Sequence, residues 1–377
     1  DTTSNACTIT LPGTASNGDE IMFVDYARNW GTNGIVIDSN GLNYQTQDDT
    51  YTVEYGTDGT ALHIVYSGAT NGWIPTLDKA VDDVPSKGNQ EGIFGFGIIN
   101  AQTESGVTNL VSNVGVVATD TAEVGTARLG PGSCEYGNDK GIFAFGINGG
   151  YTSITNLVSN TGVVASDVAG VAGVTGRSYS GACGYGGDKG IVGFGEWAIT
   201  GVTNLVSNVG VVSSDTVAVG TARYGPGACE YGGDKGIFGF GDTGSGNDVS
   251  TTNLVSNAGV VSSDVVGVGT ARERPGACKY DEDKGIFGFG NASGAYVSIS
   301  NLVSNAGVVA SDQAATTGTG RRQLAATQYG GDKGIFGYGS TGSDVSMSNL
   351  VSNAGVIASD VTGVGTARAS VAACSFN

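Results

Sequence analysis

One short phrase occurs six times in this chain, and each copy opens a similar series of segments. The phrase reads GIFGFG or a close variant, and its first residue is Gly92, Gly141, Gly190, Gly236, Gly285 and Gly334. The intervals between these glycines are 49, 49, 46, 49 and 49 residues. A period of this size is typical of repeat architectures in which each repeat is one supersecondary unit. The chain is therefore constrained to six similar units that bury a shared core.

Each repeat contains four short segments with the composition of β-strands. In the fourth repeat these are residues 235–241, 252–257, 259–263 and 277–280, which are rich in Val, Ile, Phe and Tyr and bounded by Gly, Asn and Asp. Four strands repeated six times predict an all-β fold with a six-bladed β-propeller. An open solenoid is the alternative, although it would need atypical terminal repeats. Glycines in the repeated phrase let neighbouring sheets approach closely.

The two ends of the repeat region complement each other. The first copy, EGIFGFG from Glu91, lacks the preceding Asp-Lys pair, and the chain ends GTARASVAACSFN, with a strand that has no successor. We therefore expect residues 372–376 to pair beside residues 92–97 and to close the ring by hydrogen bonds.

The remaining residues contain none of the repeat phrases. Residues 1–79 hold other short β segments, such as DEIMFVDYA and ALHIVYSG, and predict a small β-sandwich or barrel-like domain. Residues 80–90 are polar and predict a linker, and residues 91–377 form the predicted propeller.

Composition excludes several classes of partner. The formal charge is −18, from 17 Lys and Arg against 35 Asp and Glu, so the surface repels phosphate and we expect no nucleic-acid partner. No apolar run approaches the roughly 18 residues of a membrane span, so we expect no membrane insertion.

Five of the six cysteines occupy one equivalent position in successive repeats. In the fifth repeat Thr327 stands at that position, which favours a small buried filler over a disulfide partner, so we expect free buried thiols. The chain has no CxxC pair and a single histidine, His63, which we expect to be a half-buried strand residue. We therefore expect no zinc site and no cofactor. The cysteines are Cys7, Cys134, Cys183, Cys229, Cys278 and Cys374.

Two resemblances follow from these motifs. The order GTAR, ACxYGGDK, GIFGFG resembles the kelch repeat over residues 92–377, although GFG replaces the kelch double glycine and the later Tyr and Trp are absent. This resemblance implies a propeller architecture and no particular function. The spacing LP…GD…I…VDYA over residues 8–77 resembles a small β domain of bacteriophage fibres and appendages, and the NLVSNxGVVxSD repeats resemble those of phage structural proteins. These similarities imply a tail-fibre or virion-surface protein.

Each repeat carries one aspartate and one arginine at fixed positions. They could line an axial channel, or they could tie loops together by charge-assisted hydrogen bonds, and sixfold repetition favours the second interpretation. The residues are Asp120, Asp167, Asp215, Asp264, Asp312, Asp360, Arg128, Arg177, Arg223, Arg272, Arg321 and Arg368.

The stretches between the second and third strands differ among repeats and are better candidates for specificity. We expect them at one end of the propeller, opposite the tight YGGDK and SNAG turns, as variable loops on a rigid scaffold. Three aromatic residues in these loops are the candidate ligand contacts, with packing against neighbouring loops as the alternative: Tyr151, Trp197 and Tyr296.

No catalytic constellation is visible, so we expect a protein that is not an enzyme. Asp82 and Asp83 lie in the predicted linker, and residues 281–283 form one acidic turn. The expected function is a non-enzymatic virion protein whose propeller presents variable loops for recognition of a host surface or a glycan. Other virion proteins are the expected partners, with oligomerisation or attachment through the N-terminal domain. The alternatives are a structural spacer and a glycan-processing enzyme, which would need two converging carboxylates.

Overall fold

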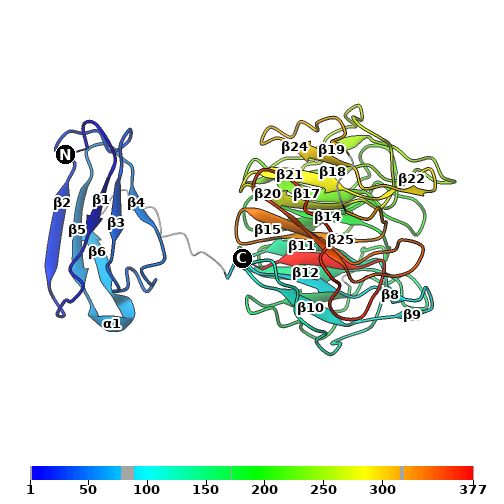
Figure 1. Ribbon diagram of the computed structural model, residues 1–377, viewed down its shortest axis with the longest axis horizontal. Helices are drawn as coiled ribbons and strands as arrows, with labels where there is room; N and C mark the ends of the chain where they lie inside the picture. Colours follow the sequence, from blue (N-terminus) through cyan, green and yellow to red (C-terminus); the bar gives the residue numbers. More distant parts are fainter. Residues whose placement is uncertain (1, 78–88, 171, 315–317, 377) are drawn as a thin grey trace. The chain divides into compact units, whose positions relative to one another are not determined.

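The computed structural model describes residues 2–77, 89–170, 172–314 and 318–376. The chain divides into two compact units, Asp1–Lys87 and Gly88–Asn377, which we call the N-terminal and C-terminal units. Most of the predicted linker, including Asp82 and Asp83, lies outside the described residues. The fold is all-β with many small sheets, as expected (Figure 1). Within the described ranges the only helix, α1 (Gly68–Asn71), is a single short turn, so no helix there could cross a membrane.

The N-terminal unit consists of two three-stranded sheets that share one buried core. Trp30, Tyr44 and Trp73 are at most 5% exposed at its centre. His63 is half-buried on a strand, as expected, and contacts Glu20 and Thr76. One sheet has the order β1 (Cys7–Thr10), β3 (Ile35–Asp38), β4 (Val53–Tyr55), and the other has the order β2 (Glu20–Val24), β5 (Ala61–Tyr66), β6 (Trp73–Leu77).

In the described part of the C-terminal unit, six three-stranded antiparallel sheets follow the repeats. The first strands are β11 (Gly132–Tyr136), β14 (Gly181–Tyr185), β17 (Gly227–Tyr231), β20 (Gly276–Tyr280), β25 (Ala325–Tyr329) and β28 (Ala372–Ser375). The second strands contain the repeated phrase and are β12 (Lys140–Ala144), β15 (Lys189–Gly193), β18 (Lys235–Gly239), β21 (Lys284–Gly288), β26 (Lys333–Gly337) and β7 (Gly92–Gly95). The third strands are β13 (Thr155–Val158), β16 (Thr203–Val206), β19 (Thr252–Val255), β24 (Ser300–Val303), β27 (Ser348–Val351) and β10 (Thr108–Val111).

Strand register separates two ends of the C-terminal unit. Gly227 pairs with Gly239, and Gly239 pairs with Thr252, so the variable stretch and the connection before β17 lie at one end. The tight turns after Tyr231 and Val255 lie at the other. We call these the loop end and the turn end. Two hairpins occupy the loop end: β8 (Ile98–Ile99) pairs with β9 (Thr103–Glu104), and β22 (Asn291–Ala292) pairs with β23 (Ala295–Tyr296). In Figure 1 the labelled strands β8, β9 and β22 lie on the same side of the C-terminal unit. The predicted separation of loops and turns is confirmed.

Each sheet contacts the next, and the last contacts the first. The first strands touch in the order β11, β14, β17, β20, β25, β28, and β28 also touches β11. Strand β28 pairs antiparallel with β7, with Cys374 opposite Ile93. The expected pairing of the two ends of the repeat region is therefore confirmed.

Glycines of the second strands allow neighbouring sheets to approach. A Cβ on Gly236 would lie 2.6 Å from Cys183 Sγ of the preceding sheet, and a Cβ on Gly239 would lie 2.8 Å from Phe287 of the following sheet. Only glycine leaves room for these side chains. All six cysteines are free, and the five repeat cysteines are buried, which confirms the expectation of unbridged thiols.

Residues 259–263, which were predicted to form a strand after residues 252–257, do not form a regular strand. It makes a single bridge between Val261 and Val255. Side chains interrupt the ladder, because Asn253 donates to the Ser262 carbonyl and Ser256 Oγ accepts from the Val260 amide. Each sheet therefore has three strands and a loosely bonded outer segment.

Candidate functional site

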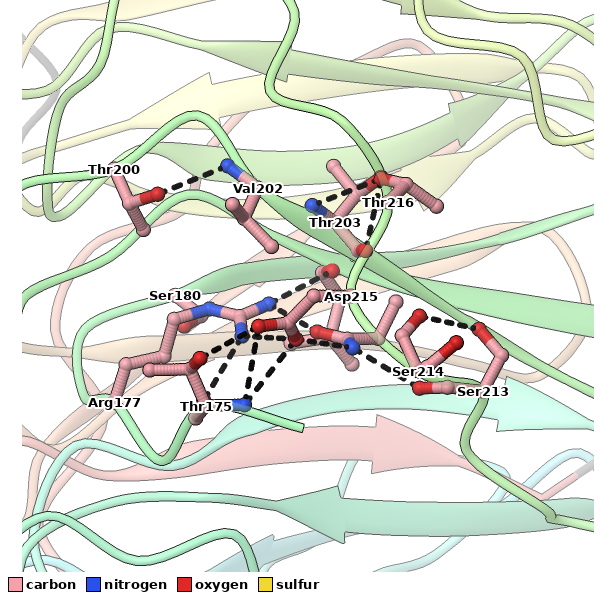
Figure 2. Close-up of polar contacts among 12 residues, drawn as sticks. Thr175, Arg177, Ser180, Thr200, Val202, Thr203, Ser213, Ser214, Asp215 and Thr216 are labelled. Carbon is pink, nitrogen blue, oxygen red and sulfur yellow. Dashed lines mark hydrogen bonds and ion pairs between the residues drawn. The ribbon is translucent and has the colours of Figure 1, made fainter. Parts of the chain in front are cut away.

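The repeated Arg, which is fully buried, and the repeated Asp, which is more exposed, form a polar cluster that ties each sheet together. In the second repeat, Arg177 Nε donates to the Phe194 carbonyl at 2.8 Å, Nη1 to the Thr175 carbonyl at 3.1 Å, and Nη2 to Asn204 Oδ1 at 2.5 Å. Asp215 accepts from the amide and the hydroxyl of Thr175. Figure 2 shows Thr175, Arg177 and Asp215 turned toward one another. We call this set and its five counterparts the arginine clusters.

The arginine is also held by the preceding sheet. Arg272 lies over the ring of Phe240, 3.9 Å from its centroid, and Phe240 has a left-handed backbone with φ 65°. This conformation is strained for a bulky residue. The carbonyl of Phe240 accepts a hydrogen bond from Arg223 at 2.8 Å, which holds it in place. Every cluster arginine is fully buried and none lines a central cavity, so the loop-tying interpretation is correct.

Burial dominates the electrostatics of these clusters. It lowers the pKa of Arg177 to about 10, and the charge of Asp215 opposes that shift. Burial alone would raise the pKa of Asp215, but hydrogen bonds from Thr175 and Asn204, together with the charge of Arg177, hold it below its ordinary value. Both groups are therefore charged at neutral pH.

The same cluster joins the two ends of the repeat region. Arg368 donates to the Phe96 carbonyl at 2.9 Å and to Asn109 Oδ1 at 2.6 Å. The amide and hydroxyl of Thr366 donate to Asp120. The two ends of the repeat region are therefore joined by side chains as well as by the pairing of β28 with β7.

The repeats differ at the second residue after each cluster arginine. At this level the six first strands surround a cavity of about 110 Å³ at the loop end. Tyr179 reaches into this opening: its hydroxyl lies 3.2 Å from Ser370 Oγ and 3.4 Å from Gln323 Nε2, and Arg274 stacks 4.2 Å from its ring centroid. The side chain of Tyr179 therefore contacts three other repeats. The residues at this position are Gly130, Tyr179, Gly225, Arg274, Gln323 and Ser370.

The neighbouring position holds a buried carboxylate, Glu273, which is 6% exposed. Its oxygens lie 3.4 Å from Arg274 Nε and 3.6 Å from Arg322 Nη1, and Asn291 Nδ2 donates to it at 2.9 Å. Asn291 Oδ1 and Arg322 Nε have no hydrogen-bond partner, and the contact between Glu273 Oε2 and Arg274 Nε is an ion pair without hydrogen-bond geometry. Buried polar atoms are rarely left unpaired, so this cluster suits the polar groups of a ligand or bound waters.

A groove of about 510 Å³ adjoins this cluster at the loop end. Tyr179 and Tyr296 supply aromatic surface, and the Arg322 guanidinium lies 5.4 Å from the Tyr296 ring centroid. Asp344 accepts a hydrogen bond from the Asn100 amide at 2.6 Å, which connects two variable stretches beside the groove. This groove is the candidate functional site.

The structure places one of the three predicted aromatic residues in the groove. Tyr296 lines it, whereas Tyr151 and Trp197 do not. Tyr151 and Trp197 are 39% and 63% exposed on other variable stretches. Burial, followed by the charges of Glu196 and Tyr179, raises the pKa of Tyr151, so Tyr151 lies near the residue that reaches into the loop-end cavity.

Sequence reasoning missed most residues of this site. Tyr179, Glu273, Arg274, Arg322 and Gln323 all follow a cluster arginine by one or two positions. Comparing those two positions across the six repeats would have found them, because the flanking residues are repeated and these are not.

Other candidate groups are structural or show no site. In the acidic turn, Lys284 Nζ contacts Asp281 Oδ2 at 2.5 Å and Asn305 donates to Asp283. Among residues 2–77, 89–170, 172–314 and 318–376, no group of three or more His, Cys, Asp or Glu is arranged to hold a metal ion.

No protein-family description matches this chain, and comparison with curated proteins also found no match.

Proposed function

We propose that this protein is a non-enzymatic recognition module in which a six-bladed β-propeller binds a carbohydrate at the loop end. The groove of about 510 Å³ lined by Tyr179, Tyr296, Arg322 and Asp344 carries this proposal. The propeller is rigid and the stretches that line the groove are variable, which is a common way to build a binding surface.

The propeller assignment is supported by hydrogen bonds that run from repeat to repeat at the loop-end cavity. The backbone amide of Tyr179 donates to the carbonyl of Gly130, that of Gly225 to the carbonyl of Tyr179, and that of Arg274 to the carbonyl of Gly225, each at 2.8 Å. The Gly130 amide donates to Ser370 at 2.9 Å, which links the first of these strands to the last. An open solenoid offers no reason for this last bond.

Carbohydrate binding is supported by the size and chemistry of the groove. Its volume falls within the roughly 300–1,000 Å³ of small-molecule sites. Tyr296 offers a ring face with a polar tip, suited to the apolar face of a sugar. Arg322, Gln323 and Asp344 offer donors and acceptors for hydroxyl groups. Glu273 is held by Arg274, Arg322 and Asn291, so it positions polar groups and is not a free acid or base.

The proposed setting is a bacteriophage virion, where the N-terminal unit attaches or oligomerises the module and other virion proteins are its partners. The similarity of residues 8–77 to a phage appendage domain supports this setting. Strand β2 is an edge strand, and its outer face leaves Met22 and Val24 about two-thirds exposed, followed by Tyr26 at 91%. An exposed apolar face on an edge strand is a frequent contact surface. Identifying the subunits that neighbour this chain in purified particles tests the setting.

Binding of the full chain to a glycan array tests the recognition function. Tyr296→Ala and Gln323→Ala should weaken binding at least about tenfold, as expected for losing a stacking or hydrogen-bonding contact of ~1.4 kcal/mol. Trp197→Ala and Tyr151→Ala test whether the outer aromatic residues contribute. Lys235→Ala, in a turn-end ion pair with Asp234, is the matched control and should bind normally.

Three results would replace this proposal. Loss of binding in Lys235→Ala but not in the groove variants would move the site to the turn end. No binding to any glycan, with the chain still found in particles, would support the spacer function. Shortening of a bound polysaccharide during incubation would indicate the glycan-processing enzyme instead.

A further inference from the structure

A second central cavity, of about 50 Å³, lies further along the first strands toward the turn end. Each first strand contributes the residue that follows the repeated Cys or Thr327. These residues differ between repeats, although the positions on both sides are repeated. They are Glu135, Gly184, Glu230, Lys279, Gln328 and Ser375.

The charged side chains line the same cavity, and two of them form an ion pair. Lys279 Nζ donates to Glu230 Oε2 at 2.9 Å. Glu230 extends over Gly184, where a Cβ would lie 1.6 Å from Glu230 Oε1. Ser375 Oγ donates to Glu135 Oε1. The absence of a side chain at Gly184 therefore lets Glu230 lean toward Glu135.

The cavity has an uncompensated negative charge and an unused acceptor. Two carboxylates and one ammonium group leave a net charge of −1 when all three are ionised. Gln328 is 5% exposed and its Oε1 has no hydrogen-bond partner. Burial raises the pKa of Glu135 to about 7, the charge of Lys279 opposes this, and the charge of Glu230 adds to it. The thiols that also line the cavity have raised pKa values through burial, so they stay neutral.

We propose that this turn-end cavity binds one alkali-metal cation, held by the carboxylates of Glu135 and Glu230 and by Gln328 Oε1. The donors are all oxygen atoms, which suit hard cations. A single positive charge balances the cavity, whereas a divalent ion would leave an excess of one charge beside Lys279. A cavity of this size has room for one ion with a few waters and is too small for a sugar.

A proton on Glu135 is the competing occupant, because it also neutralises the cavity. This site is separate from the groove, so its failure would leave the carbohydrate proposal unaffected.

The test is calorimetry of the full chain at constant ionic strength, with NaCl or KCl replacing choline chloride. At alkaline pH the alkali salt should raise the Tm of the C-terminal unit by roughly 2–4 °C, as expected for a ligand that binds the folded state alone. Glu135→Gln should remove the response, and Gln328→Leu, which keeps every charge, should reduce it. Glu123→Gln, an exposed carboxylate in the same unit, is the matched control and should respond as the parent does.

Three outcomes would overturn the proposal. The Tm could be equal in alkali and choline salts at alkaline pH, which would mean that a proton or water alone occupies the cavity. The response could persist unchanged in Glu135→Gln, which would place the cation elsewhere. A calcium salt could act at far lower concentration than the alkali salts, which would contradict the charge balance.

Discussion

The arginine clusters and the residues that surround the two central cavities lie within a few positions of each other in every repeat. The clusters are the same from repeat to repeat, whereas the cavity residues differ. Arg223 donates to the Phe240 carbonyl, and Arg272, which lies one repeat later in the chain, donates to the equivalent Phe289 carbonyl. The next positions hold Tyr224 and Gly225 in one repeat and Glu273 and Arg274 in the following one. The clusters are alike because every sheet must meet its neighbour in the same way. The cavity residues can differ because no neighbouring sheet requires a particular side chain there. In this molecule, repetition marks structural residues and departures from it mark candidate sites.

The strongest test of this comparison removes one repeated contact surface completely. A chain that ends at Val371 lacks β28, so β7 keeps β10 but loses its other ladder partner, and Ile93 loses its packing against Cys374. We expect loss of cooperative unfolding of the C-terminal unit, or association through the exposed edge, because unpaired strand edges recruit other chains. Calorimetry and light scattering measure both effects. A truncated chain that stays monomeric and melts at the parent temperature would show that β28 does not close the ring.

The second test removes one arginine from a cluster. Arg223→Met keeps much of the apolar stem but leaves the carbonyls of Phe240 and Thr221 and the side-chain oxygen of Asn253 without their charged donor. We expect a loss of about 3–5 kcal/mol in the free energy of unfolding, because three acceptors lose a hydrogen bond from one buried guanidinium. Denaturant titration measures it. Lys235→Met, which removes the partly exposed partner of Asp234, is the control and should cost less than about 1 kcal/mol. Equal losses in the two variants would contradict the structural role of the clusters.

The third test concerns the close approach of neighbouring sheets. Gly236→Ala places a methyl group 2.6 Å from Cys183 Sγ and should cost about 1–3 kcal/mol through overpacking. Adding Cys183→Ala removes the sulfur and should recover part of that loss, so the double variant should be more stable than the sum of the single losses predicts. Additive losses in a double-mutant cycle would show that the two residues do not meet.

The smallest expected effect is the contribution of one cluster carboxylate. Asp264 has a lowered pKa, because hydrogen bonds from Thr221 and Asn253 and the charge of Arg223 outweigh the effect of burial. Its ionised form therefore stabilises the fold above the unfolded-state pKa, and this contribution is lost as pH falls through the folded-state pKa. Asp264→Asn should cost about 1–2 kcal/mol at neutral pH, as for a charge-assisted hydrogen bond, with the difference shrinking in acid. Urea titrations at neutral and acidic pH measure it, and a difference that grows in acid would mean the opposite sign of the pKa shift.

Local sequence was enough to predict the strands, the pairing of the two ends, the free thiols and the role of the arginines. These features depend on contacts between neighbouring segments, and such contacts recur in every repeat, so the pattern records them six times. The segment that follows the third strand of each sheet, residues 259–263 in the fourth repeat, was wrongly predicted to be a strand. Its apolar residues have strand composition, but Asn253 and Ser256 bond to the backbone that a regular ladder would have used.

The sequence by itself determined that this chain forms an all-β fold from six similar sheets, because period, strand composition and glycine position all act between adjacent segments. Tertiary structure decided which residues meet at the centre. Tyr179 contacts Ser370, 191 positions away, and Glu230 contacts Lys279 across 49 positions. Contacts between positions so far apart in the chain are set by the arrangement of the first strands around a common cavity. No local pattern encodes them, so Glu135, Gln328 and Tyr179 gained their candidate roles only when the folded chain brought them together.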